Sequence, residues 1–493
     1  INVSRFIEYD LKNEIFQKYQ ELNVKFYKNN RVGDLMNRIS EDVSKVRMYV
    51  GPALMYTINT ISLFVIIITY MISIDPKLTM YTIIPLPILS ILIYKLSRQI
   101  NIKSKSVQES LSKLTTFSQE SFSGISIIKS NTIEDKVNDF MIEFSRETKD
   151  KSVDLAKFQS WFFPMMLLLI GCSNILVIFI GGNQYIDGEI NLGVLAEFII
   201  YVNMLTWPVA TVGWVTSIVQ QAEASQKRIN EFLSEKNEII SVNQNDYKIK
   251  GELEFKGVSL KYQETNIEAL SEIDFKINTG QSLGIIGSVG SGKSTVLELI
   301  VRNYDPDSGK ILIDNKNLKD HNIEVIRRDI GYVPQTTFLF SDTIYNNINF
   351  GNINSKAEDI QYYSKIACIH DDIMSFPKKY ASMLGERGIN LSGGQKQRLA
   401  IARALIKKPQ ILILDDSLSA LDTETEHNVI KNLKKEIKDI TKIIVSHRIS
   451  TIEKCDLILV LNSGKVIEYG THKKLCEING YYKETYDKQK TKK

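Results

Sequence analysis

The chain has 493 residues, of which 61 are basic and 57 are acidic. This length allows two to four domains, and the nearly balanced charge does not favour a nucleic-acid partner. The four cysteines stand far apart and lack CxxC spacing, which argues against a zinc site and against a disulfide framework. They are Cys172, Cys368, Cys455 and Cys476.

Long uncharged stretches occupy much of the N-terminal half. A helix needs about 20 apolar residues to cross a bilayer, and about 17 is the lower limit. Three stretches exceed this requirement and the second one meets the limit; they are 48–74, 78–94, 158–186 and 198–222. Buried helices of a soluble protein are the alternative, but four in succession favour membrane spans. The expected spans are about 49–74, 77–95, 159–182 and 194–220.

Basic residues between these stretches predict their orientation. The segments 75–77 and 187–192 are short and nearly free of Lys and Arg, whereas 95–157 carries eleven of them. Because an excess of basic residues marks the cytoplasmic side, 1–47 and 95–157 should be cytoplasmic, and the chain after the last span should be cytosolic. Apolar residues at helical spacing in 95–157 predict two long helices with a turn near Gly124.

The composition changes after the last uncharged stretch. Short β-rich runs then alternate with helical runs, which is typical of an α/β fold. We expect a membrane domain over 1–233, a polar linker over 234–251, an α/β domain over 252–485 and a polar tail over 486–493. The sequence starts with Ile1 rather than Met, so we expect further chain before it.

The segment 282–295 combines a strand, a glycine-rich loop and the start of a helix. The apolar run SLGIIG enters GSVGSGKST, which matches G-x-x-x-x-G-K-[ST]. In this motif backbone N–H groups wrap a phosphate, Lys293 reaches the β/γ-phosphates, and the Ser294 hydroxyl holds Mg²⁺. A plain glycine-rich turn is the alternative, and the strand–loop–helix context disfavours it. The predicted ATP-binding residues here are Gly287, Ser288, Val289, Gly290, Ser291, Gly292, Lys293, Ser294 and Thr295.

A second apolar run, ILIL at 411–414, leads directly into Asp415 and Asp416. A buried parallel strand is apolar throughout, and ligands bind at the carboxyl ends of such strands. We therefore expect Asp415 to support Mg²⁺ opposite Ser294 and close to Lys293. An N-cap pair that opens the next helix is the alternative, but it does not account for Lys293.

The segment LSGGQ lies between these two motifs and precedes the helical run KQRLAIARAL. Its serine and the backbone of its glycines would form a second anion-binding surface at a helix N-terminus. An ordinary N-cap turn is the alternative, although a P-loop in the same chain favours phosphate binding. The segment comprises Leu391, Ser392, Gly393, Gly394 and Gln395.

These motifs occur in the order found in ATP-binding cassette exporters, and the chain resembles a member of that family. In VSLKY, Tyr262 matches the aromatic residue that stacks on adenine. In GYVPQ, Gln335 matches the Q-loop residue that senses Mg²⁺ and the membrane domain, and in VSHR, His447 matches the switch histidine. The segment SALD matches the D-loop, whose residues are Ser419, Ala420, Leu421 and Asp422.

The resemblance implies a fold and an assembly. The expected fold is an α-helical type I exporter membrane domain of six spans, two of them before Ile1, followed by an α/β P-loop domain. The protein would lie in the plasma membrane, in contact with its lipids, with the P-loop domain in the cytosol. Turns near 27–34 and 121–130 would be coupling helices that dock on nucleotide-binding domains. Two such domains would close head to tail, with each ATP between one P-loop and the partner's signature.

Asp416 departs from the family pattern, which has Glu after the aspartate of the strand to polarise the attacking water. A misplacement of about 1 Å can cost about 10²-fold in rate. The shorter carboxylate therefore predicts a site that binds ATP well and hydrolyses it slowly. By resemblance, the catalytic residues would be Asp416, His447 and Gln335, and the metal would be held by Ser294, Gln335 and Asp415.

Such a substitution resembles one half of the heterodimeric exporters, whose slow half keeps an intact signature for the partner's active site. A heterodimer with a second half-transporter is therefore favoured over a homodimer with two slow sites. The leading interpretation is ATP-driven export of a small hydrophobic or amphipathic molecule, with lipids and peptides as alternative substrates. A second interpretation is an ATP-gated channel or regulatory subunit with little hydrolysis. A soluble cassette ATPase is a third, which the four predicted spans disfavour.

Overall fold

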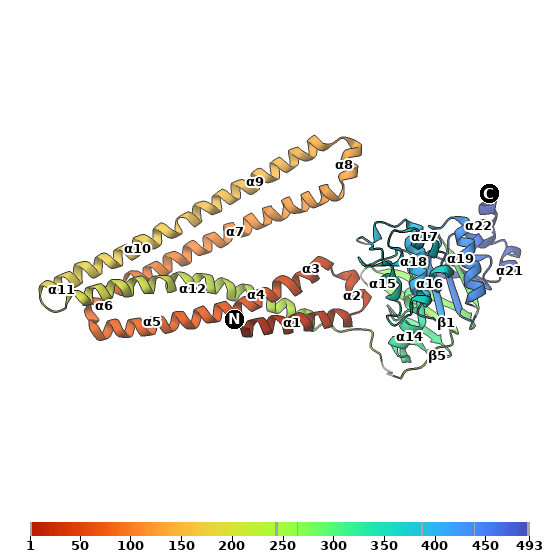
Figure 1. Cartoon of the computed structure of the whole chain (residues 1–493), viewed down its shortest axis with the longest axis horizontal. Coiled ribbons are helices and arrows are strands. Elements are labelled where there is room, and N and C mark those ends of the chain that lie inside the picture. The colour runs from red at the N-terminus through yellow and green to blue at the C-terminus, as the bar shows by residue number, and fades with distance from the viewer. Residues whose placement is uncertain (1, 242–244, 264, 386–387, 438, 491–493) are drawn as a thin grey trace. The chain divides into compact units, whose positions relative to one another are not determined.

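Figure 1 presents the chain as a computed structural model. The described residues are 2–241, 245–263, 265–385, 388–437 and 439–490. Parts of the predicted linker and tail, at 242–244 and 491–493, lie outside this description. Contacts divide the chain into two compact units: Ile1–Gln20 with Val32–Glu235, and Glu21–Arg31 with Lys236–Lys493.

The first unit is helical. In a bilayer each backbone polar group must be bonded within the spanning segment, which a helix achieves. Within the described residues, Val32–Ile74 and Glu134–Ile186 are long and apolar enough to cross a membrane, and Leu192–Leu205, the first part of α12 (Leu192–Leu233), is also apolar. The elements are α1 (Asn2–Glu21), α3 (Val32–Asn37), η1 (Arg38–Asp42), α4 (Val43–Met48), η2 (Tyr49–Ala53), α5 (Leu54–Ile74), α6 (Pro76–Ile83), α7 (Pro85–Ser123), α8 (Ile125–Asn131), α9 (Glu134–Ser160), α10 (Phe162–Leu176), η3 (Val177–Gly181), α11 (Gly182–Ile186) and α12 (Leu192–Leu233).

Helices α7 and α9 lie side by side (Figure 1), which confirms the two long helices predicted from the apolar spacing. The predicted turn is also confirmed, because α7 ends at Ser123 and the Gly124 N–H donates to the Glu120 carbonyl at 2.8 Å. The hydroxyls of Ser110 and Thr148 lie 3.0 Å apart and join the two helices.

The second unit combines two sheets with surrounding helices. Its strands are β1 (Leu253–Tyr262), β2 (Ile267–Ile277), β3 (Ser282–Gly287), β4 (Ser308–Ile313), β5 (Lys316–Asn317), β6 (Ile330–Val333), β7 (Ile411–Asp415), β8 (Thr441–Val445), β9 (Leu457–Asn462) and β10 (Lys465–Gly470). Its helices are α2 (Val24–Asn29), α13 (Lys293–Ile300), η4 (Leu318–Asp320), α14 (Ile323–Asp329), α15 (Ile344–Asn349), α16 (Ala357–Ile366), α17 (His370–Ser375), η5 (Lys379–Ala381), α18 (Gly393–Leu405), α19 (Thr423–Glu436), α20 (Ile449–Ile452), α21 (His472–Glu477) and α22 (Tyr481–Lys490).

The larger sheet has the strand order β10-β9-β3-β8-β7-β6, and only the edge strand β10 runs antiparallel to its neighbour. Strands β3 and β7 are buried along their whole length, as their continuous apolar sequences predict. Val445 of β8 is in register with Ile285 on one side and with Asp415 on the other. The P-loop and the two aspartates therefore emerge at the same edge of the sheet.

The smaller sheet, in the order β2-β1-β4-β5, is antiparallel and packs with α13 over one face of the parallel strands. A second apolar cluster joins the opposite face to α15, α16, α18 and α19. The P-loop helix α13 is thus fixed by packing on both sheets: Leu297 and Ile300 are completely buried in the first cluster. This rigid support holds the loop before it in place.

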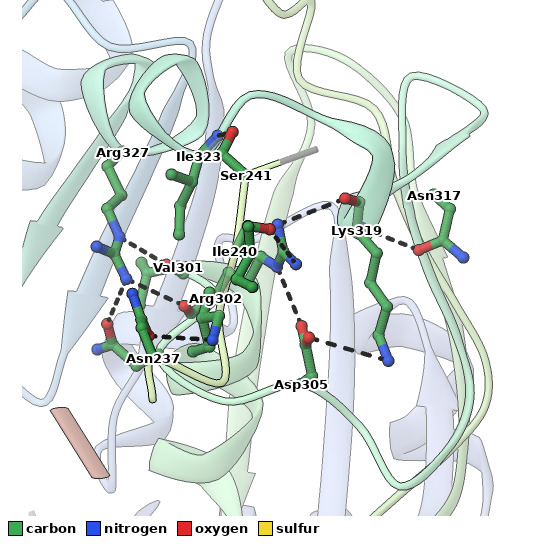
Figure 2. A network of polar contacts seen from close by, with 12 residues as sticks. Asn237, Ile240, Ser241, Val301, Arg302, Asp305, Asn317, Lys319, Ile323 and Arg327 are labelled. Carbon is green, nitrogen blue, oxygen red and sulfur yellow. Dashed lines mark hydrogen bonds and ion pairs between the residues drawn. The ribbon is translucent and has the colours of Figure 1, made fainter. Parts of the chain in front are cut away.

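The chain segment after α12 is fastened to the end of the P-loop helix (Figure 2). Arg302, 3% exposed, donates to the Ile240 carbonyl at 3.3 Å and pairs with Asp305 at 3.0 Å. Arg327 donates to the Arg302 carbonyl at 3.1 Å, and the Ile323 N–H donates to the Ser241 hydroxyl at 3.2 Å. These contacts bury an arginine without leaving its guanidinium unpaired, as burial of a charge requires.

Candidate nucleotide-binding site

The loop between β3 and α13 needs glycine at two positions. A Cβ at Gly287 would lie 2.1 Å from the Leu461 carbonyl oxygen, and one at Gly292 would lie 2.6 Å from the Ala269 carbonyl oxygen. Gly292 also has a φ of 95°, in the left-handed region that favours glycine. It is the N-cap of α13, whose first N–H groups have no partner within the helix and attract an anion.

Lys293 points back over this loop. Its Nζ donates to the Gly287 carbonyl at 3.0 Å and to the Ser288 carbonyl at 2.7 Å. Burial lowers the pKa of Lys293, and the charges of Asp416 and Asp415 partly offset that effect. The ammonium therefore stands over the phosphate-binding loop and close to both carboxylates.

Asp415, at the end of β7, is 5% exposed. Burial raises the pKa of Asp415, and the charges of Asp416 and Glu298 raise it further, whereas a hydrogen bond from Ser294 lowers it. The Tyr332 hydroxyl donates to Asp415 Oδ2 at 3.5 Å. Asp415 and Ser294, the two residues predicted to hold Mg²⁺ from opposite sides, are therefore in contact. A buried carboxylate with a raised pKa is a group that a divalent cation would stabilise.

Asp416 has a left-handed backbone, with a φ of 46°. Its N–H donates to the Val445 carbonyl at 3.0 Å, and its carbonyl accepts from the Ser419 hydroxyl at 2.7 Å. Aspartate tolerates this conformation better than most residues. Its Oδ1 is buried, and none of the described residues donates a hydrogen bond to it.

Three buried polar atoms, one in the P-loop and two just after β7, have no hydrogen-bond partner among the described residues. They are Asp416 Oδ1 and the hydroxyls of Ser291 and Ser417. Unpaired buried polar atoms are costly unless a ligand or water completes them. At the site itself, Lys293 offers a donor for phosphate oxygens, and Asp415 and Asp416 offer acceptors for a cation.

Gln335 and His447 flank the aspartates through the sheet. Gln335 stands two residues after Val333, which is in register with Leu414, and His447 stands two residues after Val445. Both side chains are exposed at the carboxyl edge of the sheet. Among the described residues no hydrogen bond connects either side chain to Asp415 or Asp416. The structure thus brings the segments of Gln335 and His447 to the site, and both side chains are exposed there without a hydrogen bond to either aspartate in the part of the chain that the structure describes.

The signature segment 391–395 forms a capped helix start. Ser392 and Gln395 make a reciprocal capping box at the beginning of α18, and the Gln395 amide donates to Asp372 at 2.8 Å. A Cβ at Gly394 would lie 3.2 Å from the Ala420 carbonyl, so the segment packs against the D-loop. Asp422 ends the D-loop and caps α19 by accepting from the Thr425 N–H at 2.9 Å.

No hydrogen bond within the described ranges connects residues 391–395 to residues 287–295. The capping box favours the simple structural role that was the alternative for Ser392, and the exposure of Ser392 and Gly393 leaves the helix start accessible to a further ligand.

Tyr262 connects the site to α2. Its hydroxyl shares a hydrogen bond of 3.2 Å with Thr295 Oγ1, and its ring meets the Tyr304 ring edge-on, with centroids 5.3 Å apart. On α2, the Lys28 Nζ lies 5.0 Å from the centroid of the Tyr304 ring. Burial lowers the pKa of Lys28, but the Tyr304 hydroxyl and the Glu298 carboxylate outweigh it and hold this pKa above its usual value. Lys28, Tyr304 and Tyr262 thus form a continuous contact from α2 to the nucleotide site.

Sequence reasoning missed several residues that support the site. Tyr332 contacts Asp415, Asp372 holds Gln395, and Arg448 donates to the D-loop carbonyls of Ser419 at 2.9 Å and Leu421 at 3.2 Å. Tyr332 and Arg448 lie inside the motifs GYVPQ and VSHR, which are the sequence signal for both residues. Asp372 lies in no recognisable pattern.

Fold and site together define a membrane protein that carries a P-loop nucleotide-binding domain. Two family models match the chain: the ABC transporter transmembrane region over residues 2–209 and the ABC transporter model over residues 270–419. The chain therefore belongs to the ATP-binding cassette (ABC) transporter family. It is a multi-pass membrane protein whose nucleotide-binding domain is cytoplasmic.

Similar proteins include several described as exporters. A Bacillus subtilis protein, described as the uncharacterized ABC transporter ATP-binding protein YknU, is 38% identical over 98% of this chain and 83% of its own length. The Escherichia coli multidrug resistance-like ATP-binding protein MdlA is 33% identical over 97% of this chain and 81% of its own length. The solved structure of a bacterial Atm1-family ABC exporter with ATP bound is similar, with a TM-score of 0.86 and 25% sequence identity. The match covers 99% of this chain and 86% of the exporter chain. The predicted fold, a helical membrane domain followed by an α/β P-loop domain, is confirmed.

Proposed function

We propose that the chain is one half of an exporter that uses ATP to move a hydrophobic or amphipathic compound out of the cytosol. One observation supports this most directly. Lys293, Ser294 and Asp415 meet at one sheet edge of a chain that also has the helices of an exporter membrane domain. Relatives described as multidrug resistance-like proteins favour small amphipathic substrates over the alternatives, lipids and peptides.

In this proposal each residue of the site has one task. Lys293 exchanges the two P-loop carbonyls for phosphate oxygens, and Tyr262 stacks on adenine. Ser294, Asp415 and Gln335 hold Mg²⁺, which when bound offsets the negative charge of the phosphates. Asp416 orients the attacking water, and His447 completes the site beside the transferred phosphate.

The coupling of ATP to transport is a shift between two conformations. A ligand moves such an equilibrium only by binding one state more tightly than the other. ATP enclosed between two nucleotide-binding domains stabilises their closed arrangement and an outward-facing membrane domain, and hydrolysis ends that preference. The contact from Tyr262 through Tyr304 to Lys28 supports α2 as the element through which this chain reports nucleotide binding.

We further propose that the functional unit is a heterodimer. Asp416 supports this, because its carboxylate is one methylene shorter than the glutamate of the family and its backbone is held by Val445 and Ser419. The signature of this chain is intact and accessible, as a partner's ATP would require. A homodimer with two slow sites is the alternative.

A gated channel or regulatory subunit with little hydrolysis is the second candidate, and Asp416 is the observation that favours it. The two functions differ in turnover. An exporter consumes ATP in proportion to the compound moved, whereas a channel passes a current that depends on ATP binding alone.

The proposal is tested by uptake of an amphipathic fluorescent dye into inside-out membrane vesicles that contain the full chain and its partner. We expect uptake that requires ATP and Mg²⁺ and that falls to background in Lys293→Ala, because the phosphate-binding charge is lost. Glu484→Gln on the exposed side of α22 is the matched control and should transport normally. ATP-dependent current without turnover would favour the channel instead.

A further inference from the structure

The loop that carries His447 is held by an element far along the chain, the last helix. The side-chain amide of Gln489, in α22, donates to the His447 carbonyl at 2.8 Å and accepts from the Ile449 N–H at 2.9 Å. The Gln489 amide therefore forms hydrogen bonds with the backbone on both sides of Arg448.

The Ile449 N–H requires such a partner. It is the first N–H of α20, and first-turn N–H groups have no acceptor within their own helix. The N-cap residue, Arg448, makes no side-chain cap, so Gln489 supplies the missing acceptor from another element. A planar amide carries one acceptor and donors in fixed geometry, which suits a neighbouring C=O and N–H.

Gln489 is itself fixed by buried packing. Tyr482, seven residues earlier and thus on the same face of α22, is fully buried, and its hydroxyl shares a 2.7 Å hydrogen bond with His472. Tyr482 belongs to a cluster that also contains Ile449 and Ile286, the latter from the strand that enters the P-loop. The helix that carries Gln489 is thus anchored on the same elements that carry the nucleotide site.

Arg448 secures the loop on its other side. Its guanidinium donates to the Ser419 and Leu421 carbonyls of the D-loop and to the Glu426 carboxylate, the last at 2.7 Å. The backbone around His447 is therefore fixed between the D-loop and α22, while its imidazole remains exposed at the sheet edge.

We propose that Gln489 is a positioning residue for ATP hydrolysis, which acts by setting where the His447 side chain stands. The inference rests on the proposed role of His447. Without the amide, the Ile449 N–H would lose its acceptor, and the loop would be held only by Arg448, by the burial of Ile449 and by the Ser446 hydroxyl, which accepts from the Arg448 N–H at 3.0 Å. His447 would then sample more positions. A displacement of about 1 Å at a reacting group can cost about 10²-fold in rate.

The hydrogen bonds of Gln489 to His447 and Ile449 are tested by amide hydrogen exchange of residues 446–452 in the full chain. In Gln489→Leu the Ile449 amide should exchange at least about tenfold faster, which corresponds to a loss of about 1.4 kcal/mol. Gln489→Glu keeps the acceptor and loses the donor, so Ile449 should stay protected in that variant. Glu484→Gln, on the exposed side of the same helix, is the control and should leave exchange at 446–452 unchanged. Unchanged exchange in Gln489→Leu would overturn the proposal.

The positioning role is tested by ATPase kinetics in the Asp416→Glu background, where turnover at this site is expected to be measurable. Gln489→Leu should lower kcat about tenfold and leave the KM for ATP within twofold. In a chain that also carries His447→Ala, Gln489→Leu should lower kcat no further, because Gln489 acts through His447.

A merely structural role would lower kcat equally with and without His447, and that outcome would overturn the inference. It would also be overturned if His447→Ala slows hydrolysis and Gln489→Leu, with faster exchange, does not. If His447→Ala leaves kcat unchanged while Gln489→Leu still speeds exchange at Ile449, the proposed role of His447 in hydrolysis fails. The hydrogen bonds of Gln489 would then be a structural feature without a role in hydrolysis.

Discussion

Asp415 and Asp416 are neighbours in sequence but have different surroundings. Asp415 ends a buried strand, contacts Ser294, and has a pKa raised by burial. Asp416 turns out of the sheet with a left-handed backbone, and its Oδ1 has no hydrogen-bond donor among the described residues. The first arrangement suits a metal ligand. The second suits a group that meets water or a phosphate only when the site is filled.

Lengthening the second carboxylate should increase turnover. Asp416→Glu extends the carboxylate by one methylene, and we expect ATP hydrolysis at this chain's own site to rise about tenfold or more, because positioning of the water limits the rate. Single-turnover hydrolysis of labelled ATP measures this. Asp416→Asn, of equal size and without charge, is the control and should hydrolyse more slowly than the parent. A Glu variant as slow as the parent would show that the geometry at 416 is not limiting.

Removing the charge of the first carboxylate should stabilise the protein in the absence of nucleotide. Since the folded-state pKa of Asp415 is raised, its contribution to stability is fully present below the unfolded-state pKa of about 3.9 and is lost as pH rises through the folded-state pKa. At pH 7 we therefore expect Asp415→Asn to melt at a higher temperature than the parent, with a difference that shrinks toward pH 4.

The same variant should lose its response to nucleotide. Binding to the folded state alone raises the melting temperature, and Asp415→Asn lacks the carboxylate that would hold Mg²⁺. Thermal melting of the solubilised full chain with and without ATP and Mg²⁺ measures both effects. Glu484→Gln, which removes the charge of an exposed carboxylate on α22, is the control and should respond to nucleotide like the parent. A nucleotide response in Asp415→Asn equal to that of the parent would contradict the metal role.

At the scale of elements, the short helix α2 belongs with the nucleotide-binding unit although it lies within the membrane-domain sequence. Asn23 caps it by accepting from the Phe26 N–H at 3.1 Å. Lys25 pairs with Glu238 at 3.0 Å, and Lys28 contacts Tyr304. Charged and aromatic contacts therefore attach α2 next to Tyr262. This helix overlaps the start of the segment near 27–34, whose role as a coupling helix stays a prediction.

Weakening the attachment of α2 should uncouple ATP hydrolysis from the binding of the transported compound. Lys28→Met keeps an apolar stem but loses the cation–π contact, which is worth roughly 0.5–2 kcal/mol. We expect basal ATP binding to be unchanged and stimulation of ATPase by an amphipathic dye to fall severalfold. The exposed Arg31, just after α2, provides the control Arg31→Met, which should be stimulated normally. Full stimulation in Lys28→Met would argue against α2 as the reporting element.

At the scale of the whole molecule, ABC exporters function as dimers, and we propose that one chain contributes only part of each ATP site. Within the described residues the signature start of α18 has no hydrogen bond to the P-loop, and it is exposed. In the proposed dimer, the signature of a second nucleotide-binding domain would complete the ATP site at this P-loop.

The identity of that second chain decides between the two assemblies. We expect the chain purified alone to hydrolyse ATP slowly, and a co-purified partner to have Glu at the position of Asp416 and an altered signature. Co-expression followed by size-exclusion chromatography and ATPase measurement tests this. A homodimer of this chain with brisk hydrolysis would contradict the heterodimer.

Several parts of the fold could be predicted from the amino-acid sequence, because the signal for each of them is local. Strands β3 and β7 were predictable from continuous apolar runs, because both of their faces are buried. The P-loop was predictable because close backbone approach at Gly287 and Gly292 admits only glycine. The turn at Gly124 followed from apolar spacing on either side of it. Each of these depends on a few consecutive residues.

The tertiary structure decided the contacts between segments that are distant in sequence. Lys28 contacts Tyr304. Gln489 lies in a segment predicted to be a polar tail, and it forms hydrogen bonds with the backbone of the loop that carries His447. No local periodicity marks either pair, because a single polar or aromatic contact leaves no repeat in the sequence. Such pairs arise only when the two sheets and the last helices have packed, and packing depends on the whole apolar core rather than on any one segment.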